Sequence, residues 1–315
     1  MAPSLVPQPA RHIGERLGRD PGRTPEPPPT LAGVTPESLE VPLPAVTLSC
    51  LAWGPEDGPL AVLLHGFPDT AWTWRHLGPL LAEHGWRVVA PHTRGYAPSG
   101  LPRDGDFHVA ALMSDAVGVH DVLGGDERAV LVGHDWGAIT ANALGAHPAS
   151  PYSRVVTMAV PPLRAMSGHG PLVLARQARM SWYTLFNQLP ALPERTFERL
   201  VRHLWAAWSP GYDAGQDLEH VLAALREPAH RSAALGYYRA AARPWQVESA
   251  YRDWHRTWTG TPTVPSLALH GAQDGCLHPR IAERAGAVLV EGAGHFLQLE
   301  RPDEVGRLVT DFLGT

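Results

Sequence analysis

Short, nearly continuous apolar runs alternate with longer amphipathic stretches from about residue 38 onward. Runs of this kind are typical of strands that helices cover on both faces, and stretches of this kind are typical of helices. The alternation predicts an α/β fold with a mostly parallel, doubly wound sheet. The runs expected to form strands are 61–64, 87–90, 129–132, 155–160 and 266–269. The stretches expected to form helices are 73–83, 109–123, 136–146, 279–285 and 303–313.

The alternation stops between residues 163 and 260, where several helix-like stretches rich in Trp, Tyr, Leu and Arg follow one another without strand signals. We expect this segment to be a helical cap inserted into a core formed by 36–162 and 261–315. Residues 1–35 contain the proline-rich runs MAPSLVPQPA and RTPEPPPT. Proline disfavours both helices and strand ladders, so we expect a disordered tail.

Charge and residue usage exclude several classes of function. The net charge is -5 and no basic run occurs, so we expect no nucleic-acid partner. No Lys is present, which excludes Schiff-base chemistry and a P-loop lysine. The 17 His residues show no short metal-ligand spacing, so neither a metal nor another cofactor is expected.

The apolar runs and the cysteines indicate where in the cell the protein is located. No apolar stretch reaches the length of about 18 residues that a membrane span needs, and the N-terminus lacks the apolar region of a secretory signal. Cys50 and Cys276 are the only cysteines, which does not suggest a disulfide framework. We therefore expect a cytoplasmic protein without membrane contact, either a monomer or a homodimer.

The segment AVLVGHDWGA places Asp135 between Gly133 and Gly137, after an apolar run and before a helix-like stretch. This is the layout of a nucleophile elbow, a tight strand-to-helix turn that needs small residues around its central position. Ser is the usual occupant. A carboxylate at this position can displace a leaving group from saturated carbon and form an alkyl ester. The alternative is a surface-turn Asp that caps the helix.

Backbone N–H groups beside the elbow are candidates for an oxyanion hole. In LLHGFPDT the candidate is the N–H of Phe67, and directly after the nucleophile it is the N–H of Trp136, at a helix N-terminus. We interpret His65 and His134, the histidines of these two motifs, as structural.

Two further side chains complete a possible triad. His295 in VLVEGAGHFLQLERP is the candidate general base, because an imidazole with an ordinary pKa suits proton abstraction near pH 7. Asp274 in ALHGAQDG is the candidate carboxylate that orients it. The chain order of nucleophile, acid and base is the order of the α/β-hydrolase fold. For Asp274, an ordinary turn carboxylate is the alternative.

Taken together, the motifs HGFPDT, RGYAPSG, GHDWGA, SWYTLFNQLP, GYYRA and GAGHFLQLERP resemble the epoxide hydrolase branch of the α/β-hydrolase superfamily. That branch is close to the haloalkane dehalogenases. The resemblance implies an α/β-hydrolase fold, two ring-opening tyrosines at Tyr183 and Tyr238, and a cis bond between Phe67 and Pro68. Relatives usually have Asp where this chain has His92, in a segment that is structural in the family.

The resemblance implies a hydrolase that opens a small-molecule epoxide to a vicinal diol through an ester on Asp135. The expected substrate contacts come from Trp136, Trp182 and Phe67. One alternative is a haloalkane dehalogenase that uses the same Asp and binds halide with the indoles of Trp136 and Trp182. The alternative from another class is a ligand-binding protein without catalysis on a hydrolase scaffold.

Overall fold

The computed structural model describes residues 35–314 of the chain, and its sheet positions the candidate nucleophile. The predicted tail lies almost entirely outside the described residues. The strands are β1 (Glu37–Pro42), β2 (Thr47–Trp53), β3 (Leu60–Leu64), β4 (Arg87–Pro91), β5 (Val130–His134), β6 (Arg154–Met158), β7 (Ser266–Gly271) and β8 (Val288–Val290). They form one sheet in the order β1-β2-β4-β3-β5-β6-β7-β8. The first two strands run antiparallel to their neighbours and the other pairings are parallel, which confirms the predicted fold class.

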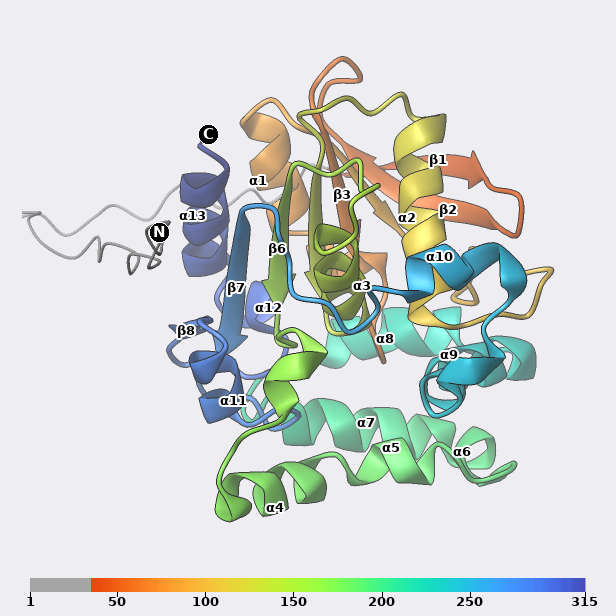
Figure 1. Ribbon diagram of the computed structural model, residues 1–315, viewed down its shortest axis with the longest axis vertical. Helices are drawn as coiled ribbons and strands as arrows, with labels where there is room; N and C mark the ends of the chain where they lie inside the picture. The colour runs from red at the N-terminus through yellow and green to blue at the C-terminus, as the bar shows by residue number, and fades with distance from the viewer. Residues whose placement is uncertain (1–34, 315) are drawn as a thin grey trace, which may run out of the picture. The chain divides into compact units, whose positions relative to one another are not determined.

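Helices cover both faces of the sheet (Figure 1). They are η1 (Ala71–Trp74, a 3₁₀ turn), α1 (Leu77–Glu83), α2 (Val109–Val122), α3 (Trp136–Gly145), α11 (Pro279–Arg284), α12 (Leu297–Glu300) and α13 (Pro302–Leu313). Alternate residues of β3 belong to different parts of the core. Val62 and Leu64 pack in the cluster that includes α2 and α3, whereas Ala61 and Leu63 pack in the cluster that includes α1 and α13. This two-sided burial explains why β3 is continuously apolar.

All regular elements between β6 and β7 are helical. They are η2 (Leu163–Met166), α4 (Pro171–Met180), α5 (Trp182–Phe186), α6 (Leu192–Arg195), α7 (Phe197–Trp208), α8 (Gly215–Ala224), α9 (Pro228–Ala241), η3 (Pro244–Gln246), η4 (Ser249–Tyr251) and α10 (Arg252–His255). In Figure 1, α4 to α7 lie beyond the carboxyl ends of the parallel strands. This arrangement agrees with the predicted helical insertion, whose bounds at 163 and 260 stay a prediction. No helix of the described chain is long and apolar enough to cross a membrane.

One predicted helix is wrong in its extent. The stretch 73–83 was expected to be continuous, but η1 ends at Trp74 and α1 begins at Leu77. A continuous helix would place Pro79 in its interior, where the ring clashes with the carbonyl of Arg75 and the Pro lacks the N–H that this carbonyl needs. In the shorter α1, Pro79 falls in the first turn, where an N–H has no helical partner.

Candidate active site

A sharp turn after β5 presents the side chain of Asp135 at the carboxyl edge of the sheet. The Asp135 backbone has φ 53° and ψ −113°, in the left-handed range of φ that side chains rarely adopt. The next residue, Trp136, begins α3. Asp135 is buried and its side chain forms no capping hydrogen bond with α3. The alternative that Asp135 is a surface helix cap is therefore wrong.

The turn is tight enough to require glycine on both sides of Asp135. A Cβ atom on Gly133 would lie 2.1 Å from the carbonyl oxygen of Gly137. A Cβ atom on Gly137 would lie 2.0 Å from the carbonyl oxygen of Leu64, in the neighbouring strand β3. Both contacts are with backbone atoms, which cannot rotate away. The close packing of β3, β5 and α3 thus explains the Gly-x-Asp-x-Gly spacing.

The two carboxylate oxygens of Asp135 have different surroundings. Oδ1 accepts a hydrogen bond of 2.7 Å from the backbone N–H of Phe67, in the loop after β3. A Cβ atom on Gly66 would lie 2.3 Å from this oxygen and 2.6 Å from the backbone nitrogen of Trp136. Oδ2 lies 3.7 Å from Nε2 of His295. One oxygen is therefore held by the predicted oxyanion loop, and the other is turned toward the predicted base.

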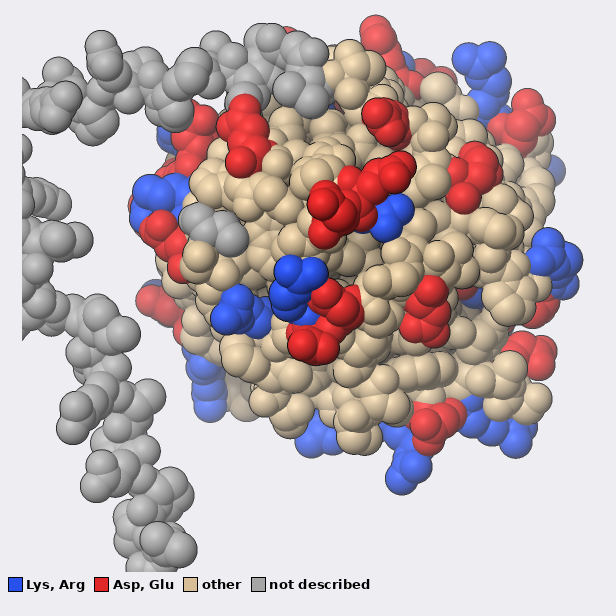
Figure 2. Space-filling view, turned by 90° about the horizontal axis from the view of Figure 1, so that it is seen from above, with Lys and Arg blue, Asp and Glu red and all other residues tan. Residues whose placement is uncertain are grey.

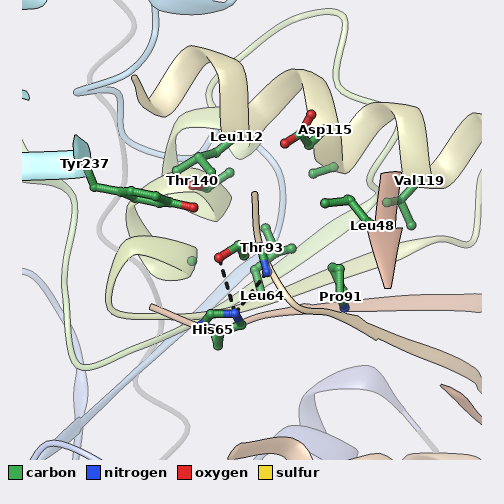
Figure 3. Close-up of a pocket in the computed structure, with 12 residues that line it drawn as sticks. Leu48, Leu64, His65, Pro91, Thr93, Leu112, Asp115, Val119, Thr140 and Tyr237 are labelled. Carbon is green, nitrogen blue, oxygen red and sulfur yellow. Dashed lines mark hydrogen bonds between the residues drawn. The ribbon is translucent and has the colours of Figure 1, made fainter. Parts of the chain in front are cut away.

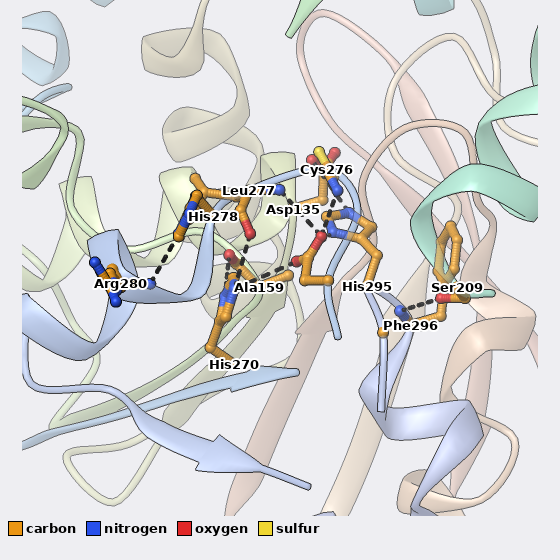
Figure 4. Close-up of polar contacts among 12 residues, drawn as sticks. Asp135, Ala159, Ser209, His270, Cys276, Leu277, His278, Arg280, His295 and Phe296 are labelled. Atoms are coloured by element: carbon orange, nitrogen blue, oxygen red, sulfur yellow. Dashed lines mark hydrogen bonds and ion pairs between the residues drawn. The ribbon is translucent and has the colours of Figure 1, made fainter. Parts of the chain in front are cut away.

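His295 and Asp274 lie together at the same edge of the sheet. His295 follows β8, and its Nδ1 is 3.0 Å from Oδ2 of Asp274, in the loop after β7. The other oxygen of Asp274 accepts hydrogen bonds from the backbone N–H groups of Cys276 (2.6 Å) and Leu277 (3.0 Å). Asp274 is thus fixed at both oxygens, and it fixes the imidazole in turn. Figure 4 shows Asp135, Cys276 and His295 gathered at this point.

The charges of the buried groups are set by their neighbours. Burial alone would lower the pKa of His295, but the carboxylates of Asp274 and Asp135 outweigh it and raise the pKa to about 10. Burial alone would raise the pKa of Asp274, but His295, His270 and backbone N–H groups outweigh it and hold the pKa below its usual value. The free site therefore holds an imidazolium between two carboxylates.

A cavity of about 370 Å³ opens in front of Asp135. Its walls come from α3, η2, α4, α5 and the end of α9, with Leu277 from the core loop. Tyr183 on α5 and Tyr238 on α9 line it together with Trp136. Both tyrosines are buried, and their ring centroids lie 5.6 Å apart. The structure thus brings the two tyrosines into one cavity with Asp135.

The hydroxyl groups of the two tyrosines are not equivalent. Tyr183 Oη lies 3.4 Å from Sγ of Cys276, within hydrogen-bonding range for sulfur. Tyr238 Oη has no hydrogen-bond partner among residues 35–314. Burial raises the pKa of both phenols well above the usual value, so both stay protonated. The neighbouring Tyr237 donates its hydroxyl to the carbonyl of Arg94 at 2.8 Å and does not line the cavity.

Two predicted substrate contacts need correction. Trp182 does not line the cavity, because the residues of α5 that do are Tyr183, Thr184 and Leu185. Its indole packs on Phe186 and His203 and remains 42% exposed. The ring of Phe67 is fully buried against Tyr238 and does not line the cavity either, so Phe67 contributes only its N–H.

As predicted, His65 and His134 are structural residues that form hydrogen bonds with the backbone of neighbouring loops. His65 bonds to the carbonyl oxygen of Gly66 through Nδ1 at 2.9 Å, and its Nε2 accepts from the N–H of Thr93 at 3.0 Å. His134 reaches the carbonyl oxygen of His295 through Nε2 at 2.9 Å. The implied cis bond between Phe67 and Pro68 is present. These contacts fix the loops that carry the candidate catalytic groups.

A second cavity, behind His65, has a volume of only about 10 Å³. Figure 3 shows Leu64, Asp115, Thr140 and Tyr237 among the side chains around it. This volume is sufficient for about one water molecule. It is a packing defect in the core and not a substrate site.

The sequence prediction did not include Cys276 or His270. Cys276 lines the cavity, and burial together with the nearby Asp274 and Asp135 raises the pKa of its thiol well above the usual value. His270 Nε2 lies 3.6 Å from Oδ2 of Asp274. The available signal was their closeness to Asp274 in the chain. No motif distinguishes them from ordinary core residues.

Asp274, Cys276 and His295 offer oxygen, sulfur and nitrogen atoms within 4.8 Å of one another. Metal binding needs a thiolate and a free imidazole nitrogen. The Cys276 thiol is held in its protonated form, and His295, whose pKa the two carboxylates raise to about 10, carries a proton on both ring nitrogens and offers no lone pair. The chemistry of this donor set therefore does not fit a metal.

Comparisons with known proteins agree with this geometry. Residues 59–302 match the family described as the alpha/beta hydrolase fold. Epoxide hydrolase A of Mycobacterium tuberculosis is 31% identical in an alignment that covers 85% of this chain and 94% of the relative.

Among solved structures, epoxide hydrolase A of Mycobacterium thermoresistibile has a TM-score of 0.70 and 28% identity, with 89% of this chain and 98% of that chain covered. An epoxide hydrolase from an endophytic Streptomyces has a TM-score of 0.69 and 27% identity, with 89% and 96% covered.

Proposed function

The chain belongs to the α/β-hydrolase fold family, in its epoxide hydrolase branch, and we propose that it opens an epoxide to a vicinal diol through an alkyl ester on Asp135. The observation that carries this proposal is the Asp135 carboxylate itself. It lies in an elbow usually occupied by Ser, in one cavity with two protonated tyrosines.

In the first step, Oδ2 of Asp135 attacks an epoxide carbon, and the bond between that carbon and the ring oxygen breaks. Oδ2 is the attacking atom because Oδ1 is held by the Phe67 N–H. The ring oxygen gains negative charge and takes a proton from a tyrosine, for which the unpartnered hydroxyl of Tyr238 is the first candidate. The product of this step is an ester between Asp135 and the opened substrate.

Ester formation removes the negative charge of Asp135, one of the two charges that raise the pKa of His295. The imidazole then releases its proton, which replaces the one that the tyrosine gave. Neutral His295, oriented by Asp274, takes a proton from water, and the water oxygen attacks Cγ of Asp135. The oxyanion forms on Oδ1 against the Phe67 N–H. The bond from Cγ to Oδ2 breaks, and Oδ2 takes the proton from His295 as the diol leaves. The new carboxyl group of Asp135 then gives its proton to His295, which restores the imidazolium between two carboxylates.

The cavity favours an epoxide over a haloalkane. A leaving halide needs N–H donors, and the expected second donor, Trp182, lies outside the cavity. The groups that face Asp135 across the cavity are phenol hydroxyls, which can give a proton to an oxygen leaving group.

The variant His295→Gln tests the two-step scheme. It should still form the ester but not hydrolyse it, so intact-mass measurement after mixing with styrene oxide should show a stable adduct of one substrate mass. The double variant His295→Gln with Asp135→Asn is the control and should show no adduct, which also excludes alkylation of Cys276. Absence of an adduct in folded His295→Gln protein would contradict the proposal.

A further inference from the structure

Exposed large apolar side chains are concentrated on one part of the cap. Ten such side chains occur among the described residues, and six of them fall between residues 172 and 192. We call these six the apolar cap face: Leu172, Leu174, Trp182, Leu185, Leu189 and Leu192. Single apolar side chains scattered over a surface are ordinary, whereas larger exposed apolar patches mark contact surfaces.

The apolar cap face reaches the active-site cavity at one residue, Leu185. Its residues belong to α4, α5, α6 and the turn between α5 and α6, and Figure 1 shows these helices at the end of the cap that is farthest from the sheet. Leu185 is 76% exposed and also lines the cavity, so it marks the entrance. A surface that covered this face would therefore lie directly at the substrate's point of entry.

The charge of the same segment is entirely positive. No Asp or Glu occurs between Asp135 and Glu194. Arg176 and Arg179 on α4 are exposed, and neither forms an ion pair within residues 35–314. The first acidic residue beyond the segment, Glu194, is paired with Arg239 at 2.7 Å. By contrast, Figure 2 shows acidic and basic side chains interspersed on the end of the molecule opposite the cap.

We propose that the apolar cap face docks reversibly on an anionic lipid surface, and that an apolar epoxide dissolved in that surface enters the cavity beside Leu185. Exposed Leu and Trp side chains enter the outer acyl region, while the arginines reach the anionic headgroups. This inference rests on the proposed function for its substrate and on the surface itself for its docking. It departs from the expectation, drawn from the sequence, of a protein without membrane contact.

A second copy of the chain fits this face less well. The commonest dimer contact is two-fold symmetric and places the same patch on both partners. Such a contact would bring Arg176 and Arg179 of each copy close to those of the other, and the segment from 163 to 193 contains no carboxylate to compensate. An anionic partner removes this repulsion.

Co-sedimentation with vesicles tests the docking without any substrate. The full chain should bind phosphatidylglycerol vesicles at least tenfold better than phosphatidylcholine vesicles, and the binding should be lost in about 1 M NaCl, where screening is nearly complete. The variant Arg176→Gln with Arg179→Gln should weaken binding by about fivefold per arginine. The variant Leu172→Ser with Leu174→Ser should weaken it by roughly tenfold per side chain.

Matched controls lie outside the face: Arg226→Gln with Arg252→Gln for charge, and Leu101→Ser with Val122→Ser for apolar exposure. These should bind as the parent does, and all variants should hydrolyse a water-soluble epoxide at the parental rate. Equal binding to both lipids, or equal loss in face and control variants, would overturn the docking. If the parent is a dimer and the variant Leu172→Ser with Leu174→Ser is a monomer, the face is a subunit interface, and the docking proposal is overturned. Docking by a chain that hydrolyses no epoxide would refute the proposed function alone.

Discussion

Tyr183 and Tyr238 line one cavity, but their hydroxyl groups differ in their hydrogen-bond partners. Tyr183 is within hydrogen-bonding range of Cys276, whereas Tyr238 has no partner among residues 35–314. Either atom can be the donor in the contact between Tyr183 and Cys276, so Tyr183 can accept from the protonated thiol and still donate to a substrate oxygen. Tyr238 has no such contact with any described residue. Cys276 is therefore a positioning residue that acts through Tyr183.

The replacement Tyr238→Phe should slow ester formation by about 10² to 10³-fold, because it removes the unpartnered proton donor. Tyr183→Phe should slow it less. Cys276→Val removes the contact with similar volume and should reduce the rate several-fold in the parent, but not in the Tyr183→Phe variant. Rapid-quench measurement of ester formation checks these rates. An equal effect of Cys276→Val in both backgrounds would refute the positioning role.

Among residues, the chemistry-bearing groups were predictable because each follows a strand in a Gly-rich turn. Asp135, Asp274 and His295 all meet at the carboxyl edge of the sheet. Trp182 was not predictable in this way. A side chain on a short cap helix points inward or outward according to the packing of that helix, and no periodic pattern of five residues determines that direction.

At the scale of elements, the loop after β3 and the start of α3 must approach closely at Asp135. Gly66 is the point of contact, since a Cβ atom there would occupy the space beside Oδ1 of Asp135 and the nitrogen of Trp136. In the proposed mechanism, the same oxygen carries the negative charge of the tetrahedral intermediate. The separation of the two elements at Gly66 thus determines whether this charge can be held.

Gly66→Ala should therefore lower kcat by about 10² to 10³-fold, the usual cost of disturbing an oxyanion hole. Gly170→Ala is the matched control, because a Cβ atom there meets no atom within 4 Å. Steady-state kinetics on folded variants, verified by circular dichroism, checks this expectation. A kcat for Gly66→Ala equal to that of the parent would show that the loop after β3 can shift without disturbing the oxyanion hole.

The five strands β3 to β7 were predictable to within two residues, because burial on both faces leaves a continuous apolar run. Strand β2 was not predicted, although it lies inside the sheet. Strand β1 was not predicted either, since only Val41 of its six residues is buried, Leu39 is partly buried and the other four are exposed. Strand β8 has three residues and is too short to show a period. Edge strands depend on pairing with a neighbour, and the pairing partner is not local in the sequence.

At the scale of the whole molecule, the core holds several neutral histidines. Burial lowers the pKa of His65 to about 4 and that of His92 and His134 to about 3. The unfolded chain binds protons at these positions below its pKa of about 6.5, and the folded chain does not. Stability is therefore lost as pH falls from 6.5 toward 4. Burial raises the pKa of Asp69 to about 7, so between pH 4 and 6.5 the folded chain holds a proton there that the unfolded chain does not. This proton offsets the effect of one of the three histidines.

The free energy of unfolding should thus fall by roughly 3 kcal/mol per pH unit between pH 6.5 and 4, the slope for net uptake of two protons. Urea unfolding at a series of pH values measures this slope. His92→Gln removes one of the titrating groups without touching the candidate site and should reduce the slope by about half. A free energy that is constant across this range would contradict the assignment of neutral buried histidines.

The proposed function depends on attack at the epoxide carbon by Asp135 and not by water. A single turnover with enzyme in excess, run in water enriched in ¹⁸O, distinguishes the two by mass spectrometry. If Asp135 attacks, the diol of the first turnover should contain no ¹⁸O, and the peptide that contains Asp135 should contain ¹⁸O. A diol that already carries ¹⁸O in that first turnover, with Asp135 unlabelled, would show that water attacks the epoxide carbon directly.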